Sequence, residues 1–205
     1  MITWIDAKSG AAMVFNTDQE GAITCAQPAF QTGSDFRGIA TGFAPDPDGC
    51  MYCDPLLATQ PVPGSDARPP FVFHLGNSAR ARASLAADRP VDLIVTGFAE
   101  TFKSWRDTDE YRSTQAKDDA PVSVLGFVYD PARPSPSQYI VTAPVLKAEK
   151  RLNSATNVEF WWLWLRAGFG DSETAIVVRE EDVPFGVEPG NVVEAQFWAC
   201  AMSIG

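Results

Sequence analysis

The sequence predicts a mainly β protein with two lobes, a small OB-like or meander β-barrel in its C-terminal half, and one or two short helices. At 205 residues the chain is long enough for one large domain or two small ones. It contains 16 prolines and 15 glycines, which favour turns and interrupt helices. Between them lie many short runs rich in β-branched and aromatic residues, as is typical of strands.

Eight of these runs are the clearest predicted strands. They are Ala12–Asn16, Phe71–Leu75, Val91–Phe98, Val122–Tyr129, Tyr139–Ala148, Phe160–Arg166, Ala175–Arg179 and Val192–Ser203. A helix is predicted over Thr108–Lys117, where a threonine can cap the first turn, acidic residues follow and a basic residue ends the segment. Ser78–Ala87 is rich in alanine and stopped by Pro90, but its Ala/Arg alternation would also suit a strand.

The proline-rich segment DPARPSPSQ, residues 130–138, has the composition of a linker. It divides the chain into an N-terminal β-rich lobe, residues 1–130, and a C-terminal OB-like β-barrel, residues 139–205. The hexapeptides IATGFA (39–44) and IVTGFA (94–99) differ at one position, and IVT recurs at 140–142. This weak internal similarity allows for a duplication but does not require one.

The C-terminal region contains four or five strands joined by short turns, which could close as a small barrel of the OB type or form a simple meander. Its segments IVTAPVLKAEKRLN, EFWWLWLRAG and GNVVEAQFWACAMSI, with TGFAET before them, resemble a loose group of uncharacterised bacterial proteins. The resemblance covers about residues 91–205. The ending ACAMSIG departs from the small polar-basic finish of that group. The resemblance implies an OB-like barrel and no activity.

The formal net charge is −10, and the acidic excess is spread along the chain. Its small basic clusters are of the kind that lies on a solvated face, so binding to nucleic acid or to an anionic membrane is disfavoured. The first residues lack a basic segment followed by an apolar one, so no signal peptide is expected. We therefore expect a cytoplasmic protein, in which the four cysteines stay reduced.

Several catalytic motifs are absent from the sequence. It has one histidine, His74, which excludes sites built on two or three histidines. It contains no GxxxxGK[ST] motif, no GxGxxG after a strand and no GxSxG. His74 alternates with Phe73 and Leu75 in a predicted strand, where a structural histidine is the simpler interpretation. No catalytic residue is therefore assigned.

The segment PDPDGCMYCDP, residues 45–55, places Cys50 and Cys53 at a spacing that lets two thiolates reach one metal ion from a tight turn. Cys25 and His74 could complete a Cys3His zinc site, although these outer spacings match no compact zinc module. A redox pair is disfavoured, because Asp54-Pro55 opposes a following helix and nearby acids raise the pKa of a thiol. The alternative is an ordinary turn with two reduced thiols. No cofactor is expected apart from this zinc ion.

The run FWWLWLRAGF carries aromatic residues on both faces of its predicted strand. Alternation places Phe160, Trp162 and Trp164 on one face, and Trp161 on the other with two leucines. The leucine face is the better core candidate, which leaves the first three residues as a ligand-binding surface or as a second packed face.

These observations favour a non-enzymatic cytoplasmic protein that contacts a protein or a small neutral ligand through this aromatic β face. Two alternatives remain. One is a zinc-stabilised protein in which an open coordination position allows hydrolysis. The other is an acidic inhibitor or immunity-type protein that binds a basic partner.

Overall fold

The structure is a computed structural model that describes residues 2–44, 56–60, 70–76, 85, 87–115, 121–127, 137–169 and 173–204. These residues are mainly β, with one short α-helix and one turn of 3-10 helix. No helix within these ranges is long and apolar enough to cross a membrane. In chain order the elements are β1 (Ile2–Ile5), β2 (Ala11–Thr17), β3 (Ile23–Phe30), β4 (Ser34–Phe43), β5 (Leu56–Thr59), β6 (Phe71–Leu75), β7 (Arg89–Trp105), α2 (Thr108–Thr114), β8 (Val124–Phe127), β9 (Gln138–Asn153), β10 (Val158–Leu165), β11 (Thr174–Arg179), η1 (Glu180–Asp182) and β12 (Val192–Ser203).

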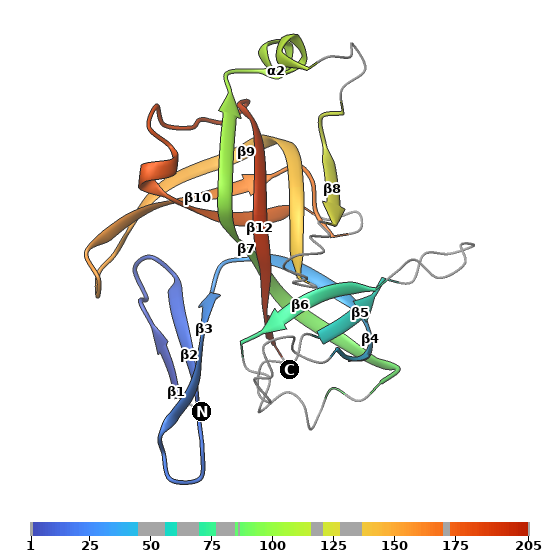
Figure 1. Cartoon of the computed structure of the whole chain (residues 1–205), viewed down its shortest axis with the longest axis vertical. Helices are drawn as coiled ribbons and strands as arrows, with labels where there is room; N and C mark the ends of the chain where they lie inside the picture. The colour runs from blue at the N-terminus through green and yellow to red at the C-terminus, as the bar shows by residue number, and fades with distance from the viewer. Residues whose placement is uncertain are drawn as a thin grey trace.

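Strands β1, β2 and β3 form a small antiparallel sheet at one side of the molecule (Figure 1). Every second residue of β2 is buried, because successive side chains of a strand point to opposite faces. Ala12 and Val14 of β2 pack with Ala29 of β3, and Met202 of β12 packs against them. The small sheet therefore rests on the large one by its buried face.

The other nine strands form one mixed sheet that nearly closes into a ring. Eight of these strands follow two circuits (Figure 1), and β8 pairs with β9 outside them. In the first, β9, β10 and β11 form an antiparallel meander, β11 runs parallel to β7, β7 pairs with β12, and β12 pairs with β9. In the second, β4, β5 and β6 form the meander, β6 runs parallel to β12, and β7 pairs with β4.

The long strands β7 and β12 belong to both circuits. Residues 89–95 of β7 pair with β4, and residues 96–98 continue with β11. In the same way, residues 192–198 of β12 pair with β9, and residues 200–201 continue with β6. The two circuits thus have the same connectivity with the roles of β7 and β12 exchanged. In the first circuit β7 is the parallel neighbour of the meander and β12 its antiparallel neighbour, and in the second circuit β12 is the parallel neighbour and β7 the antiparallel one.

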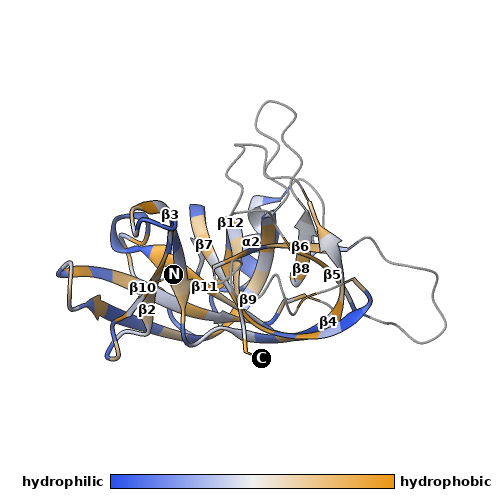
Figure 2. Ribbon diagram, turned by 90° about the horizontal axis from the view of Figure 1, so that it is seen from below, coloured by the Kyte–Doolittle hydropathy of each residue, from blue (hydrophilic) through white to orange (hydrophobic). Residues whose placement is uncertain are grey.

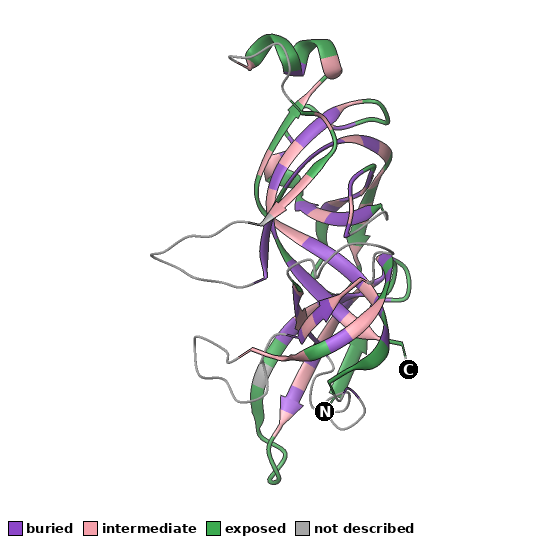
Figure 3. Ribbon diagram, turned by 90° about the vertical axis from the view of Figure 1, so that its right-hand side faces the viewer, coloured by how far each residue is buried: buried purple, intermediate pink, exposed green. Residues whose placement is uncertain are grey.

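One hydrophobic core runs through both circuits. Phe36 of β4 and Leu163 of β10 belong to the same buried cluster. Tyr139 of β9 joins the circuits directly, because its hydroxyl accepts a hydrogen bond from the Val72 N–H of β6 at 2.8 Å. Burial raises the pKa of Tyr139 well above its ordinary value. Hydrophobic and polar residues alternate along the strands (Figure 2), and the buried bands continue from one circuit into the other (Figure 3).

The mainly β prediction is confirmed, and each of the eight predicted strands overlaps a strand of the structure. Strands β1, β3, β4 and β5 are absent from the prediction. The predicted helix is present as α2, but its N-cap is Asp107, one residue earlier than predicted. Asp107 has extended backbone angles and accepts a hydrogen bond from the Glu110 N–H at 2.8 Å. The undecided segment Ser78–Ala87 lies almost wholly outside the described residues.

The predicted lobes, residues 1–130 and 139–205, stay a prediction. Residues 128–136, which include most of the predicted linker 130–138, lie outside the described ranges, and Gln138 is buried at the start of β9. Strands from both sides of this segment take part in the same large sheet.

Candidate functional site

Strand β10 has two packed faces, and they follow the predicted alternation. Leu163 and Leu165 belong to the main core. Phe160 and Trp162, on the opposite face, form a second buried cluster with Phe30 of β3. Both faces of β10 are therefore used in packing.

The face that the sequence suggested for ligand binding is largely covered by the chain itself. Phe160 and Trp162 are 8% and 6% exposed. The ring of Phe30 meets Phe160 edge to face at a centroid distance of 5.8 Å, and the Trp162 indole N–H donates to the Thr32 carbonyl oxygen at 2.9 Å. Trp164 is partly buried, and its indole N–H donates to a carboxylate oxygen of Glu173. A role of Phe160, Trp162 and Trp164 in binding stays a prediction.

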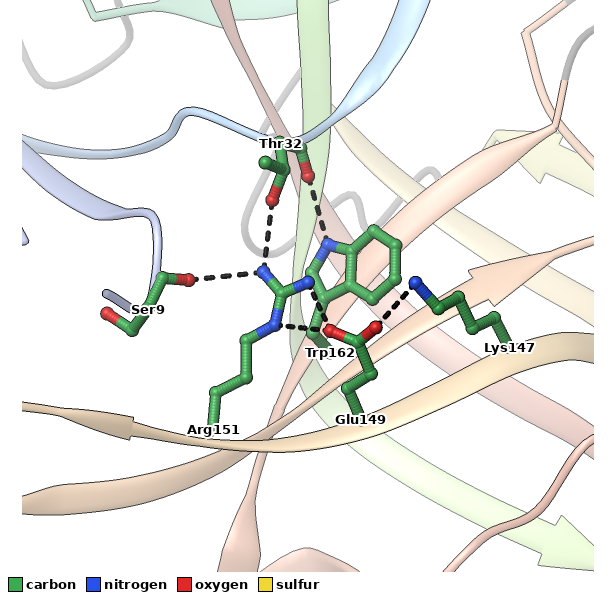
Figure 4. A network of polar contacts seen from close by, with 6 residues as sticks. All are labelled: Ser9, Thr32, Lys147, Glu149, Arg151 and Trp162. Atoms are coloured by element: carbon green, nitrogen blue, oxygen red, sulfur yellow. Dashed lines mark hydrogen bonds and ion pairs between the residues drawn. The ribbon is translucent and has the colours of Figure 1, made fainter. Parts of the chain in front are cut away.

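A polar network centred on Arg151 completes the covering of this face of β10 (Figure 4). The Arg151 guanidinium carbon lies 4.3 Å from the centroid of the Trp162 ring. One guanidinium nitrogen, Nη1, donates to the Ser9 carbonyl oxygen at 3.1 Å and to Thr32 Oγ1 at 3.0 Å. Arg151 therefore joins β9 to the segments that flank β2 and β3, and it does so over the face of an aromatic ring.

Glu149, on the same strand, holds the Arg151 guanidinium in place. Its carboxylate accepts a hydrogen bond from Arg151 Nε at 2.8 Å and lies 2.5 Å from Lys147 Nζ. The hydrogen bonds from Lys147 and then from Arg151 lower the pKa of Glu149 below its ordinary value. A carboxylate held between two cations fixes the orientation of these side chains. We therefore interpret the network as a joint, that is, a structural contact that fastens the small sheet to the large one.

A second joint lies at Asp6, between β1 and β2. Its buried carboxylate accepts hydrogen bonds from Ser9 Oγ at 2.6 Å, Ser154 N–H at 2.9 Å and Ser154 Oγ at 2.8 Å. These bonds hold the pKa of Asp6 well below its ordinary range. Because Ser154 lies in the turn between β9 and β10, this joint also anchors the small sheet to the large one.

Neither joint was predicted, although the sequence carries a signal for the one at Arg151. Lys147, Glu149 and Arg151 alternate along β9 and lie opposite Trp164, Trp162 and Phe160, respectively. Lys147, Lys150 and Arg151 form one of the small basic clusters that the sequence suggests lie on a solvated face. Alternation alone would have separated Lys150, which instead bonds Glu159 and Glu180.

An aromatic cleft of about 400 Å³ lies at one end of the first circuit. Three aromatic residues line it: Trp105 at the end of β7, Trp161 of β10 and Phe185 in the connection between η1 and β12. Phe185 is 98% exposed, the most exposed large apolar residue among those described. Trp161 was expected on the core face of β10, and it does pack partly against the main core, whereas Trp105 and Phe185 were not predicted as site residues.

The walls of the aromatic cleft are held together by Asn191. Its side-chain N–H donates to the Arg106 carbonyl oxygen at 2.9 Å, and its side-chain oxygen accepts from the Glu188 N–H at 2.8 Å. Glu110 of α2 accepts a hydrogen bond from the Arg106 N–H at 2.5 Å, which fixes the start of the helix against the end of β7. The lining of the cleft thus comes from three parts of the chain, namely the end of β7 with the start of α2, strand β10, and the connection between η1 and β12.

A larger hollow of about 570 Å³ lies beside the turn between β9 and β10, but its character is different. Its lining is dominated by charged side chains, and these are paired. Lys150 lies 2.8 Å from Glu159, and Arg179 lies 2.8 Å from Glu181. The aromatic cleft is the better candidate for ligand binding, because aromatic side chains beside polar groups are typical of small-molecule sites, and the described lining of the larger hollow contains no aromatic residue.

The proposed zinc ligands lie largely beyond what the structure describes. Cys50 and Cys53 fall outside the described residues, and the side chain of Cys25, in β3, is not described. His74 lies in β6 with its ring 6.3 Å from that of Trp198. Within the described residues no group of three or more His, Cys, Asp or Glu side chains could hold a metal ion. Zinc binding stays a prediction.

Comparison with protein-family models, with curated proteins and with solved structures gives no match for this chain. The aromatic cleft and the covered face of β10 therefore have to be interpreted from their own chemistry.

Proposed function

We propose that this protein is a non-enzymatic binding protein that takes a small ligand in the aromatic cleft. The observation that carries the proposal is the convergence of Trp105, Trp161 and the exposed Phe185 on one hollow of about 400 Å³. Large apolar side chains left uncovered next to a hollow mark binding sites more often than scattered exposed residues do.

A binding role, rather than a catalytic one, is supported by two of the polar side chains in the cleft. Asn191 and Glu110 hydrogen-bond to the backbone of neighbouring residues, which positions the walls. A general acid or base would need a free reach toward a substrate. The net charge of −10 disfavours an anionic ligand, nucleic acid or an anionic membrane surface. A cytoplasmic location belongs to the same proposal.

We also propose that each circuit of strands is a small OB-like barrel. A three-stranded meander closed by a parallel pair is consistent with that connectivity, and OB-type barrels bind ligands at their second and third strands and the adjoining loops. In the first circuit these strands are β10 and β11, so the covered face of Phe160, Trp162 and Trp164 would be the corresponding surface. The zinc-stabilised and inhibitor alternatives stay predictions.

The test follows the six tryptophan indole N–H signals by ¹H–¹⁵N NMR during titration with a neutral branched alcohol, 3,3-dimethyl-1-butanol. We expect the signals of Trp105 and Trp161 to shift with saturation while that of Trp198, on another surface, stays unchanged. Phe185→Ala should weaken the response, and the fold should be kept because the side chain is exposed. The matched control is Val158→Ala, which removes another exposed apolar side chain outside the cleft. Equal shifts at all exposed tryptophans would contradict the proposal.

A further inference from the structure

We infer that the aromatic cleft selects a quaternary ammonium cation, that is, a positively charged nitrogen carrying methyl groups. This inference rests on the proposed function and deepens it, because it names the chemical class of the ligand. Three properties of the cleft support it: the sign of its charge, the pairing of its polar groups and the arrangement of its aromatic rings.

The charged groups at the cleft leave a negative excess. Glu110 and Glu188 line it, and among the residues that the structure describes Arg106 is the one cation in its lining. The Arg106 side chain is itself paired, with Nε 3.2 Å from a carboxylate oxygen of Asp107. The two glutamates are therefore not neutralised by Arg106, and the field in the cleft attracts a cation.

The neutral side-chain amide of the cleft and one of its carboxylate oxygens are already hydrogen-bonded, which leaves carboxylate oxygens of Glu110 and Glu188 facing the ligand. Asn191 uses its amide N–H and its amide oxygen on the backbone of Arg106 and Glu188, and one carboxylate oxygen of Glu110 accepts the Arg106 N–H. A sugar would bring more hydroxyl groups than these remaining carboxylate oxygens can accept, and hydroxyls left without partners in a cleft are costly. A quaternary ammonium ion has neither donors nor acceptors, so it loses no hydrogen bond on entering.

The aromatic rings provide the attraction that such a cation needs. The face of an indole or phenyl ring carries negative electrostatic potential, and aromatic walls are a known means of holding quaternary ammonium ions. Trp105 is fixed by an edge contact with Tyr111, with centroids 5.0 Å apart. Gly186 lies beside Trp161, where a Cβ would be 3.9 Å from the indole, and Trp161 is partly buried with contacts to the main core. Phe185 forms the outer wall.

The experiment compares two probes of nearly the same shape. Choline carries the trimethylammonium group, and 3,3-dimethyl-1-butanol replaces its nitrogen with carbon. Both are titrated into the full chain while the Trp105 and Trp161 indole signals are followed by NMR. We expect choline to bind about tenfold more tightly than the alcohol. Glu188→Gln should weaken choline several-fold and leave the alcohol unchanged, and Phe185→Ala should weaken both. Val158→Ala should alter neither.

The outcomes separate the two proposals. Equal affinity for the two probes at Trp105 and Trp161 would overturn the preference for a cation while leaving the binding function intact. If neither probe shifts these two signals, both proposals are overturned. Choline binding that is unaffected by Glu188→Gln and Phe185→Ala would place the cation elsewhere and overturn the inference. A peptide carrying trimethyl-lysine, compared with its unmodified form, distinguishes a modified protein side chain from a free small molecule as the source of the same chemistry.

Discussion

Replacing Trp162 with alanine is the sharpest test of the covered β10 face. Truncating a buried tryptophan costs about 3–5 kcal/mol of unfolding free energy, and Trp162 is 6% exposed. Its hydrogen bond to the Thr32 carbonyl and its contact with the Arg151 guanidinium are lost as well, and each contributes about 1 kcal/mol. Because these contributions overlap, we expect a total loss of about 4 kcal/mol.

The assay is urea denaturation followed by circular dichroism. With a slope of about 2 kcal/mol per M, the expected loss lowers the midpoint by about 2 M. The matched control is Trp198→Ala, which truncates a tryptophan that is 40% exposed on another surface and should cost less than about 1.5 kcal/mol. If both variants lose the same stability, Trp162 is not covered by Phe30 and Arg151, and the reasoning about this face is refuted.

Three further predictions concern other parts of the molecule. Gly97→Ala should cost about 1–3 kcal/mol in urea denaturation, because a Cβ there would lie 2.4 Å from the Phe197 ring and 2.9 Å from Ile176; an unchanged midpoint would contradict this close packing. The pKa of the Asp6 carboxyl is lowered in the folded state, so its contribution to stability is present above the unfolded pKa of about 3.9 and is lost as the pH falls below it. Thermal unfolding at a series of acidic pH values should therefore show a weaker pH dependence for Asp6→Asn, and identical profiles would argue against the joint. Burial raises the pKa of the Cys200 thiol to about 12, so a thiol reagent followed by peptide mass spectrometry should modify Cys200 quickly after denaturation and slowly before it; rapid modification of the native protein would show that the thiol is accessible.

Local patterns in the sequence were sufficient to predict much of the β structure. β12 and β6 match their predicted bounds because both are rich in apolar residues, and proline or glycine residues lie close to their ends. The strands that were missed carry weaker signals. β3 contains Pro28, which is tolerated because β3 is an edge strand of the small sheet. β4 contains Gly38 and Gly42, and Gly38 is required because a Cβ there would lie 2.5 Å from the Thr59 carbonyl oxygen.

The candidate sites depend on contacts between distant segments, which a single sequence does not reveal. Alternation along β10 correctly separated Leu163 from Trp162, but nothing local indicated that Phe30 would cover the second face. The aromatic cleft brings Trp105, Trp161 and Phe185 together only through the pairing of β7 with β12 and of β10 with β11. The repeated hexapeptides fall in β4 and β7, which pair with each other, so they do not mark equivalent strands of the two circuits.

The exchange of β7 and β12 between the circuits has a consequence for synthesis of the protein. The meander of β4, β5 and β6 is translated early. Its circuit is completed by β12, which begins more than eighty residues after the end of β7. At about 5–20 residues per second, the ribosome needs on the order of ten seconds to supply it. During that interval β6 and part of β7 have no closing partner, and such open edges can pair with another nascent chain. We therefore expect co-translational folding to be postponed until β12 leaves the exit tunnel, and holding chaperones to protect the early strands until then.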